Sequence, residues 1–270
     1  MLKQRFWTAL VLAPIVLAGL FLLSFELFKL FIAAIVLLGA WEWANLSGIQ
    51  SATGRFGYVS LVAALLALAN YILPGGDYES LLLLAVGFWI VALFWVVNYP
   101  SAKGWQSGWQ RFLIGLVVLV PSWMALVSIQ RHPGGDVILL MLLLLIWGAD
   151  IGAYFAGKTW GNKKLAPHVS PGKTLAGLWG GLVACALVSL GFIVYLELEL
   201  MVAVYLLLLS VIAGLVSVLG DLFESMLKRY RGIKDSSNLL PGHGGILDRI
   251  DSITSAAPLF VVGIHALPIF

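Results

Sequence analysis

Apolar stretches of about 20 residues recur along the whole chain, and they limit its fold more than any other feature. They lie at residues 7–24, 27–46, 57–74, 79–98, 110–130, 136–157, 175–195, 200–222 and 252–269. A helix needs about 20 apolar residues to cross the hydrocarbon core of a bilayer. With 61% hydrophobic residues, a soluble domain of 270 residues has too little interior for so much apolar surface. We therefore predict an all-α, polytopic integral membrane protein with about nine transmembrane helices.

Short polar connections separate the predicted spans, and we find no soluble domain among them. Connections such as "SGIQSATGRFG" and "YPSAKGWQSGWQ" are rich in Gly, Ser or charged residues. The first span follows a basic start, but no cleavage site leads into a polar chain, so we interpret it as retained. We divide the chain into an N-terminal transmembrane region, residues 1–135 with about five spans, and a C-terminal transmembrane region, residues 136–270, which holds the candidate catalytic residues.

The basic residues predict how the chain is oriented. Of 16 lysines and arginines, all but Lys29 and Arg131 lie at the N-terminus or in the second, fourth, sixth and eighth connections. Short cytoplasmic loops retain positive charge, so the N-terminus should be cytoplasmic and the C-terminus on the opposite side. Orientation and contact with lipid headgroups account for Arg55, Lys103 and Arg111. The sixth and eighth connections also contain carboxylates, histidines and clustered glycines, which orientation does not require.

Acidic residues gather near the cytoplasmic ends of the last predicted spans. Asp221 and Glu224 are three residues apart and so share one face of a helix. Asp248 and Asp251 repeat this spacing at the start of the ninth span, and Asp150 lies within the sixth or near its cytoplasmic end. A carboxylate inside a span costs at least ~2.5 kcal/mol on insertion scales and is a functional hypothesis by default.

Three other features have plainer interpretations. Glu42, in "GAWEWANL", is read as an interfacial residue within a belt of tryptophans. Gly177 and Gly181 have the spacing of closely packed helices. Cys185 lies in an apolar run and is expected to fill space between helices.

Converging carboxylates repel one another unless a cation lies between them. Oxygen ligands beside basic residues favour Mg²⁺, and no Cys/His set has the spacing of a zinc site. The predicted ligands are Asp221, Asp248 and Asp251. The alternative, which stays open here, is that these acids pair with neighbouring basic residues as a structural ion network.

Two glycine-containing connections have the features of an anion site. In "PGHGG" the backbone can come close to a ligand, and its N–H groups precede a helix expected to start near Ile246. His243 can donate to a phosphate oxygen there. "SPGKT", residues 170–174, lacks the first glycine of a P-loop, but it offers Lys173, Thr174 and a helix N-terminus.

The residues from Ser225 to Asp251 follow a long pattern: S-x-x-K-R-x-x-x-x-K-D, five variable positions, then P-G-H-G-G-x-x-D-R-x-D. This signature, residues 225–251, resembles that of the bacterial phosphatidate cytidylyltransferases, also called CDP-diacylglycerol synthases. "DIGAYFAGKTWGNKKLAPHVSPGKT" is also similar to the central loop of that family, whereas the N-terminal spans match only in hydropathy. One departure is Ala176, where the family usually has a glutamate.

The resemblance implies a reaction at the bacterial inner membrane. CTP and phosphatidate give CDP-diacylglycerol and pyrophosphate, with two divalent ions, or one divalent Mg²⁺ and one monovalent ion. The partners are CTP, the lipid and the bilayer, without nucleic acid, and a homodimer stays open. The implied catalytic residues are Asp221, Asp248, Asp251 and Lys228. The implied substrate-binding residues are Ser170, Lys173, Thr174, Ser225, Arg229, Lys234, Asp235, His243, Gly244, Gly245 and Arg249, with Asp150 and Glu224 as further candidates.

Two other classes compete with this hypothesis. Acids in the membrane beside basic loops also suit a transporter of an anionic solute. However, the sequence has no paired broken helices or inverted repeat, and the acids gather at one end of the spans. The CDP-alcohol phosphotransferases use CDP-diacylglycerol, but their aspartate-rich motif is absent.

Overall fold

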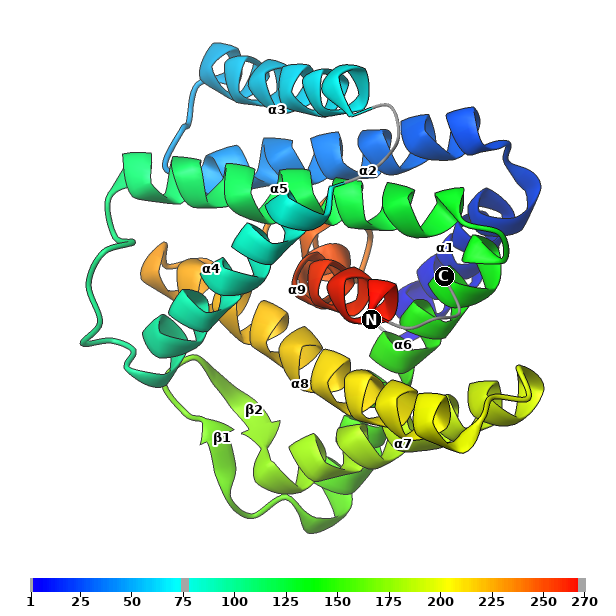
Figure 1. Ribbon diagram of the computed structural model, residues 1–270. Helices are drawn as coiled ribbons and strands as arrows, with labels where there is room; N and C mark the ends of the chain where they lie inside the picture. Colours follow the sequence, from blue (N-terminus) through cyan, green and yellow to red (C-terminus); the bar gives the residue numbers. More distant parts are fainter. Residues whose placement is uncertain (1, 74–77, 267–270) are drawn as a thin grey trace.

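The computed structural model describes residues 2–73 and 78–266, without the side chains of residues 2–7 and 9. Within these residues the chain forms nine helices and one two-stranded hairpin, which confirms the all-α class (Figure 1). In chain order the elements are α1 (Leu2–Leu22), α2 (Phe25–Leu46), α3 (Ala52–Ile72), α4 (Glu79–Val97), α5 (Gly108–Arg131), α6 (Gly135–Trp160), β1 (Lys164–Ala166), β2 (Ser170–Thr174), α7 (Leu175–Tyr195), α8 (Leu200–Tyr230) and α9 (Leu247–His265).

Seven of these helices, α2 to α8, are long and apolar enough to cross a membrane. The first and ninth predicted spans also coincide with helices, α1 and α9, although neither is among the seven. α1 offers a shorter apolar segment, Leu10–Leu22, and α9 begins with the charged residues Asp248, Arg249 and Asp251. The last residues of two expected spans, residue 74 and residues 267–269, lie outside the described residues.

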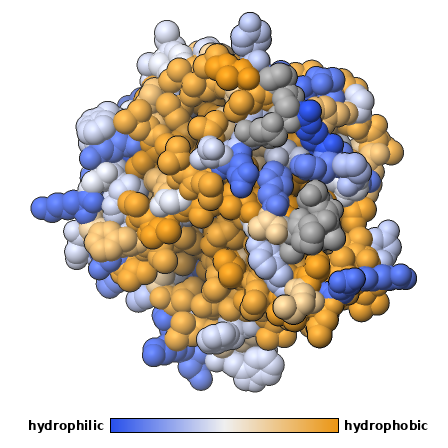
Figure 2. Space-filling view, in the orientation of Figure 1, coloured by the Kyte–Doolittle hydropathy of each residue, from blue (hydrophilic) through white to orange (hydrophobic). Residues whose placement is uncertain are grey.

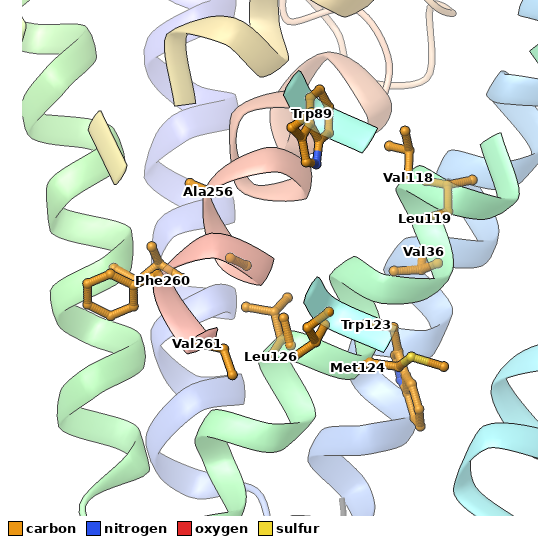
Figure 3. Packing of buried hydrophobic residues seen from close by; sticks show 14 of the residues in the cluster. Val36, Trp89, Val118, Leu119, Trp123, Met124, Leu126, Ala256, Phe260 and Val261 are labelled. Carbon is orange, nitrogen blue, oxygen red and sulfur yellow. The ribbon is translucent and has the colours of Figure 1, made fainter. Parts of the chain in front are cut away.

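α9 is the central helix of the molecule. It packs against α2, α4, α5, α6 and α8, and it lies in the middle of the ribbon diagram (Figure 1). Figure 3 shows Ala256, Phe260 and Val261 on α9 with labelled neighbours from α2, α4 and α5 around them; all three are fully buried. Residues 1–135 and 136–270 therefore share one core, because α9 is enclosed partly by helices of the N-terminal region.

The outer surface carries many large apolar side chains. Leu84, Val194 and Met201 are 72%, 77% and 82% exposed. The face in Figure 2 is mostly hydrophobic, and hydrophilic residues lie around its edge and in its upper part. Exposed apolar patches larger than a few hundred Å² are rare on soluble monomers, so this surface fits a multi-pass membrane protein.

Glycines bring α6 and α7 together. A Cβ on Gly177 would lie 2.9 Å from the carbonyl oxygen of Ala153, and one on Gly181 would lie 2.8 Å from that of Ala149. Side chains at these positions would therefore force the helices apart, which confirms the predicted close packing. Cys185 is fully buried on α7, with Sγ 3.5 Å from the Leu145 carbonyl oxygen, as expected of a packing residue.

The sixth connection, expected as a loop, contains the antiparallel hairpin β1–β2. Lys164 pairs with Thr174, and the amide of Leu175 donates to the Lys163 carbonyl oxygen at 2.9 Å. β2 contacts α8, so the hairpin leads from α6 to α7 beside the polar end of α8 (Figure 1).

The N-terminus and the even-numbered connections meet at one end of the helices. Thr8 Oγ1 donates to the Pro241 carbonyl oxygen at 2.9 Å, and Arg229 Nε donates to that of Val169 at 3.3 Å. Arg111 Nε donates to the Leu46 carbonyl oxygen at 2.7 Å. The expected contact of Arg111 with lipid headgroups is wrong, because this side chain is buried between the second and fourth connections.

Candidate active site

One face of α8 carries the candidate residues of the signature. Asp221, Glu224, Ser225 and Lys228 are three or four residues apart and lie on the same side of the helix, as predicted for Asp221 and Glu224. Ser225 Oγ donates to Asp221 Oδ1 at 3.2 Å. Lys228 Nζ lies 3.0 Å from Glu224 Oε1, and Glu224 is almost completely buried. The last turns of α8 thus contain a buried ion pair beside a more accessible aspartate.

Asp248 connects α8, α9 and the eighth connection. Its Oδ1 accepts from Lys228 Nζ at 2.6 Å. Its Oδ2 accepts from the amide and the hydroxyl of Ser236, both at 2.9 Å, and from the amide of Gly245 at 2.7 Å. These four donors hold Asp248 in one place. The ion pairs of Lys228 with Asp248 and Glu224 are contacts of the kind that the alternative, a structural ion network, expects.

Asp221 faces the hairpin instead. Its Oδ2 lies 2.8 Å from Lys173 Nζ of β2. The side chains of Lys173 and Asp221 remain 24% and 31% exposed, whereas those of Lys228 and Asp248 are 9% and 6% exposed. The ion pair between hairpin and α8 is therefore open to a ligand from outside, while the pair between α8 and α9 is enclosed.

Two further acids lie close enough to interact with this ion pair. Asp251 on α9 experiences the charges of Asp221, Lys228 and Lys173. Asp150 on α6 experiences those of Lys173, Asp221 and Arg249. Asp150, Asp221 and Asp251 thus lie within electrostatic reach of Lys173 from three helices. The predicted cluster was a different one, Asp221 with Asp248 and Asp251.

The predicted anion site in "PGHGG" is occupied by the protein's own carboxylates. Glu42 on α2 accepts from the amides of Ile246 and Leu247, at 3.0 and 2.7 Å, and the amide of Gly245 donates to Asp248. Glu42 is 2% exposed, so its placement at a membrane interface is wrong. A buried acid is stable here because the N–H groups of the first turn of α9 lack partners within the helix.

The other substrate-binding candidates have different surroundings. Thr174 caps α7, because its hydroxyl accepts from the Gly177 amide at 3.1 Å, and it is buried. His243 and Gly244 belong to a turn closed by the Leu240 amide, which donates to the Gly244 carbonyl oxygen at 2.8 Å. Ser170 is half-buried in β2. Four charged side chains are exposed: Arg229 on α8, Lys234 and Asp235 in the eighth connection, and Arg249 on α9.

The acids differ in how well they suit Mg²⁺. Asp221 and Asp251 offer carboxylate oxygens and repel one another, which fits a hard cation. Asp248 fits less well, because its side chain is only 6% exposed and its Oδ2 already accepts three hydrogen bonds, whereas Asp221 is 31% exposed and has one partner on each oxygen. Among the described residues, no three His, Cys, Asp or Glu side chains are gathered as a metal cluster. The Mg²⁺ site therefore stays a prediction.

Comparison with known proteins assigns the chain to a family. The model of a group described as the cytidylyltransferase family matches residues 3–267. The chain belongs to the cytidylyltransferase family.

Several relatives are similar to this chain over nearly their whole length. A phosphatidate cytidylyltransferase of Pseudomonas aeruginosa is 49% identical over 261 residues, which cover 96% of each chain. One of Haemophilus influenzae is 39% identical over 280 residues, covering 96% of this chain and 97% of the relative. One of Brucella suis is 37% identical over 262 residues, covering 96% and 91%.

Three residues of the candidate site were not predicted from the sequence: Glu42, Ser236 and Ser237. Glu42 accepts hydrogen bonds from both serine hydroxyls, and the serines fall among the variable positions of the signature. An acid within a span is a functional hypothesis by default, which holds for Glu42 as for Asp150, but the tryptophans beside Glu42 favour an interfacial position. Ala176, at the position that is usually acidic, lies half-buried in the first turn of α7.

Proposed function

We propose that this protein condenses CTP with phosphatidate to give CDP-diacylglycerol and pyrophosphate. The observation that carries the proposal is the open ion pair of Lys173 and Asp221, set beside Asp150 and Asp251 at one end of membrane-spanning helices. Relatives named phosphatidate cytidylyltransferase, matching over 96% of this chain, support the choice of substrates. A lipid phosphate held at the membrane surface and a nucleotide from water can both reach such a place.

The reaction needs little acid–base chemistry from the protein. The phosphate of phosphatidate is already anionic, and its oxygen attacks the α-phosphorus of CTP. A new bond forms between that oxygen and the α-phosphorus. The bond from the α-phosphorus to the oxygen bridging to the β-phosphorus breaks, and pyrophosphate leaves with the electron pair. The difficulty is to hold two anions in line, so the protein acts by positioning and by offsetting charge.

The basic residues have two roles in this proposal. Lys173 and Arg229, both accessible, bind the phosphates of CTP and the lipid. Lys228 is fixed between Glu224 and Asp248, so its ammonium needs no reorganisation when charge develops on the departing pyrophosphate.

The proposed cofactor is Mg²⁺. Asp221 and Asp251 would hold it, and Asp248 stays the third predicted ligand. When bound, Mg²⁺ offsets phosphate charge and orients the reacting oxygens. The protein's own part is to keep Asp221 beside Lys173 and Ser225, where its charge is available at the open side of the site.

A test in detergent micelles separates this enzyme from a transporter. Purified wild-type protein is expected to convert CTP and phosphatidate into CDP-diacylglycerol and pyrophosphate when Mg²⁺ is present, and to lose that turnover with EDTA. Lipid products and released pyrophosphate are measured separately, and their amounts should match. A transporter would form neither product, because micelles have no two sides; absence of both would contradict the proposed function.

We also propose that this end of the helices faces the cytoplasm of a bacterium and that the chain lies in its inner membrane. The support is the excess of lysine and arginine in connections that contact one another at this end. A cysteine placed at Asn162 or Asn238, with Cys185 substituted, should resist an impermeant thiol reagent in intact cells. Labelling at either position from outside would reverse the orientation.

A further inference from the structure

Glu42 joins the second helix to the eighth connection and to α9. Its carboxylate accepts from the hydroxyls of Ser236 and Ser237 and from the amides of Ile246 and Leu247. The sequence separation between these partners reaches 205 residues, and the carboxylate is almost completely buried. Four donors from two segments on one buried acid are more than helix packing requires.

A charged group is suited to this place because α9 lacks a cap of its own. The residue before the helix is Ile246, and no side chain of its own caps the first turn. Unpaired N–H groups at a helix start carry partial positive charge, and hydrogen bonds from them to a carboxylate are stronger than those between neutral groups. Glu42 thus supplies from α2 the cap that most helices obtain from the residue preceding them.

Gly245 independently indicates that this contact is built into the site. A Cβ at Gly245 would lie closer than 3 Å to both carboxylate oxygens of Glu42 and to Ser236 Oγ. Glycine is therefore needed at position 245, because a larger residue would collide with the Glu42 carboxylate. The signature and Glu42 fit one another sterically, although they are distant in the sequence.

Ser236 connects Glu42 to the candidate catalytic residues. Its hydroxyl lies 2.9 Å from Glu42 Oε2 and 2.9 Å from Asp248 Oδ2, and its amide also donates to Asp248. Asp248 in turn holds Lys228 at 2.6 Å. A shift of the eighth connection would therefore move Asp248 and release Lys228 from its place on α8.

We propose that Glu42 is a positioning residue of the active site, which acts through Ser236 and the start of α9 on Asp248 and Lys228. This inference rests on the proposed function for the reaction that it affects. Glu42 itself touches neither substrate in this account. Its loss should lower the turnover of bound substrates more than it weakens CTP binding.

The test compares Glu42→Gln with Glu26→Gln, an exposed glutamate on the same helix. Glutamine is similar in size but places an NH₂ group against donors, so local contacts break while the helix remains. Steady-state kinetics in micelles, corrected for the folded fraction, should show kcat reduced about 10–100-fold in Glu42→Gln, the range typical of supporting residues. KM for CTP should change less than about threefold, and Glu26→Gln should match the wild type.

Hydrogen–deuterium exchange supplies a readout that does not depend on activity. Peptides from residues 234–250 should exchange faster in Glu42→Gln, while peptides from α6 and α7 keep their wild-type rates. Gly245→Ala should reproduce both the kinetic and the exchange result, because its Cβ would displace Glu42. Gly87→Ala, with no atom within 4 Å of the added Cβ, is its control.

The possible results decide the proposal. Faster local exchange with unchanged kcat would make Glu42 a purely structural residue and overturn the inference, as would a change in KM alone. If Glu42→Gln loosens the whole molecule, Gly245→Ala decides by the same criteria. Wild-type protein without activity would contradict the proposed function instead, and the exchange comparison would still decide whether Glu42 holds the eighth connection.

Discussion

The two polar connections at the active end, residues 161–174 and 231–246, have similar compositions but different structures. Both contain glycines, basic residues and a following helix start, and both were predicted to bind an anion. The first forms a hairpin that presents Lys173 to Asp221 at an accessible place. The second directs the amides of Gly245, Ile246 and Leu247 to the buried carboxylates of Glu42 and Asp248.

This difference assigns substrate contact to the first connection and support of the catalytic residues to the second. Backbone N–H groups that already have a carboxylate partner are not available to phosphate, whereas an accessible lysine is. In our account the hairpin contacts CTP, and the 231–246 connection holds Asp248 and Lys228 in place. A glycine-rich motif beside a helix start therefore indicates an anion site. In the 231–246 connection the anions are the protein's own carboxylates, Glu42 and Asp248.

The largest effect is expected for substitution of Asp248, which the 231–246 connection holds in place. Asp248→Asn puts an amide NH₂ against donors and removes the charge that holds Lys228, so kcat should fall at least ~10²-fold, the scale on which catalytic charge groups contribute. The loss of hydrogen bonds at this buried group should also lower the free energy of unfolding by about 1–3 kcal/mol. Kinetics per folded molecule and thermal unfolding measure the two effects.

Asp136→Asn, in the first turn of α6, is a control for the same chemical change outside the site. It should leave kcat near the wild-type value. Near-normal turnover of Asp248→Asn would remove the 231–246 connection from the catalytic machinery and break the comparison between the two connections.

The helices were predictable from the sequence because apolar length alone decides them. The seven membrane-spanning helices lie within a few residues of the expected spans, except that α8 continues to Tyr230. Its last turns contain Glu224 and Lys228, which the hydropathy pattern assigns to water. They remain helical because Lys228 pairs with Glu224 and Asp248 inside the protein.

The site was predictable in its residues and less so in its contacts. Spacing placed Asp221 and Glu224 on one face of a helix, and both lie on α8, where Ser225 and Lys228 share that face. The sequence could not reveal what fills the space left by Gly245, because the group that fills it, Glu42, comes from α2. A contact across some 200 residues has no local pattern, and the tryptophans beside Glu42 favoured an interfacial reading.

A smaller effect, on binding alone, tests the division between the two connections most directly. The measurement is the equilibrium dissociation constant of CTP in micelles without phosphatidate, for wild type, Lys173→Ala and Asp248→Asn. Removing Lys173 takes away an accessible cation and leaves the charge of Asp221 facing the nucleotide. Lys103→Ala, in the fourth connection, removes the same charge from an exposed place outside the site.

Our account predicts that Lys173→Ala weakens CTP binding about tenfold, which corresponds to roughly 1.4 kcal/mol. Asp248→Asn and Lys103→Ala should stay within about twofold of the wild type, because neither residue contacts CTP in this account. The opposite result, with CTP binding weakened by Asp248→Asn and unchanged by Lys173→Ala, would contradict the assignment of substrate contact to the hairpin and of support to the 231–246 connection.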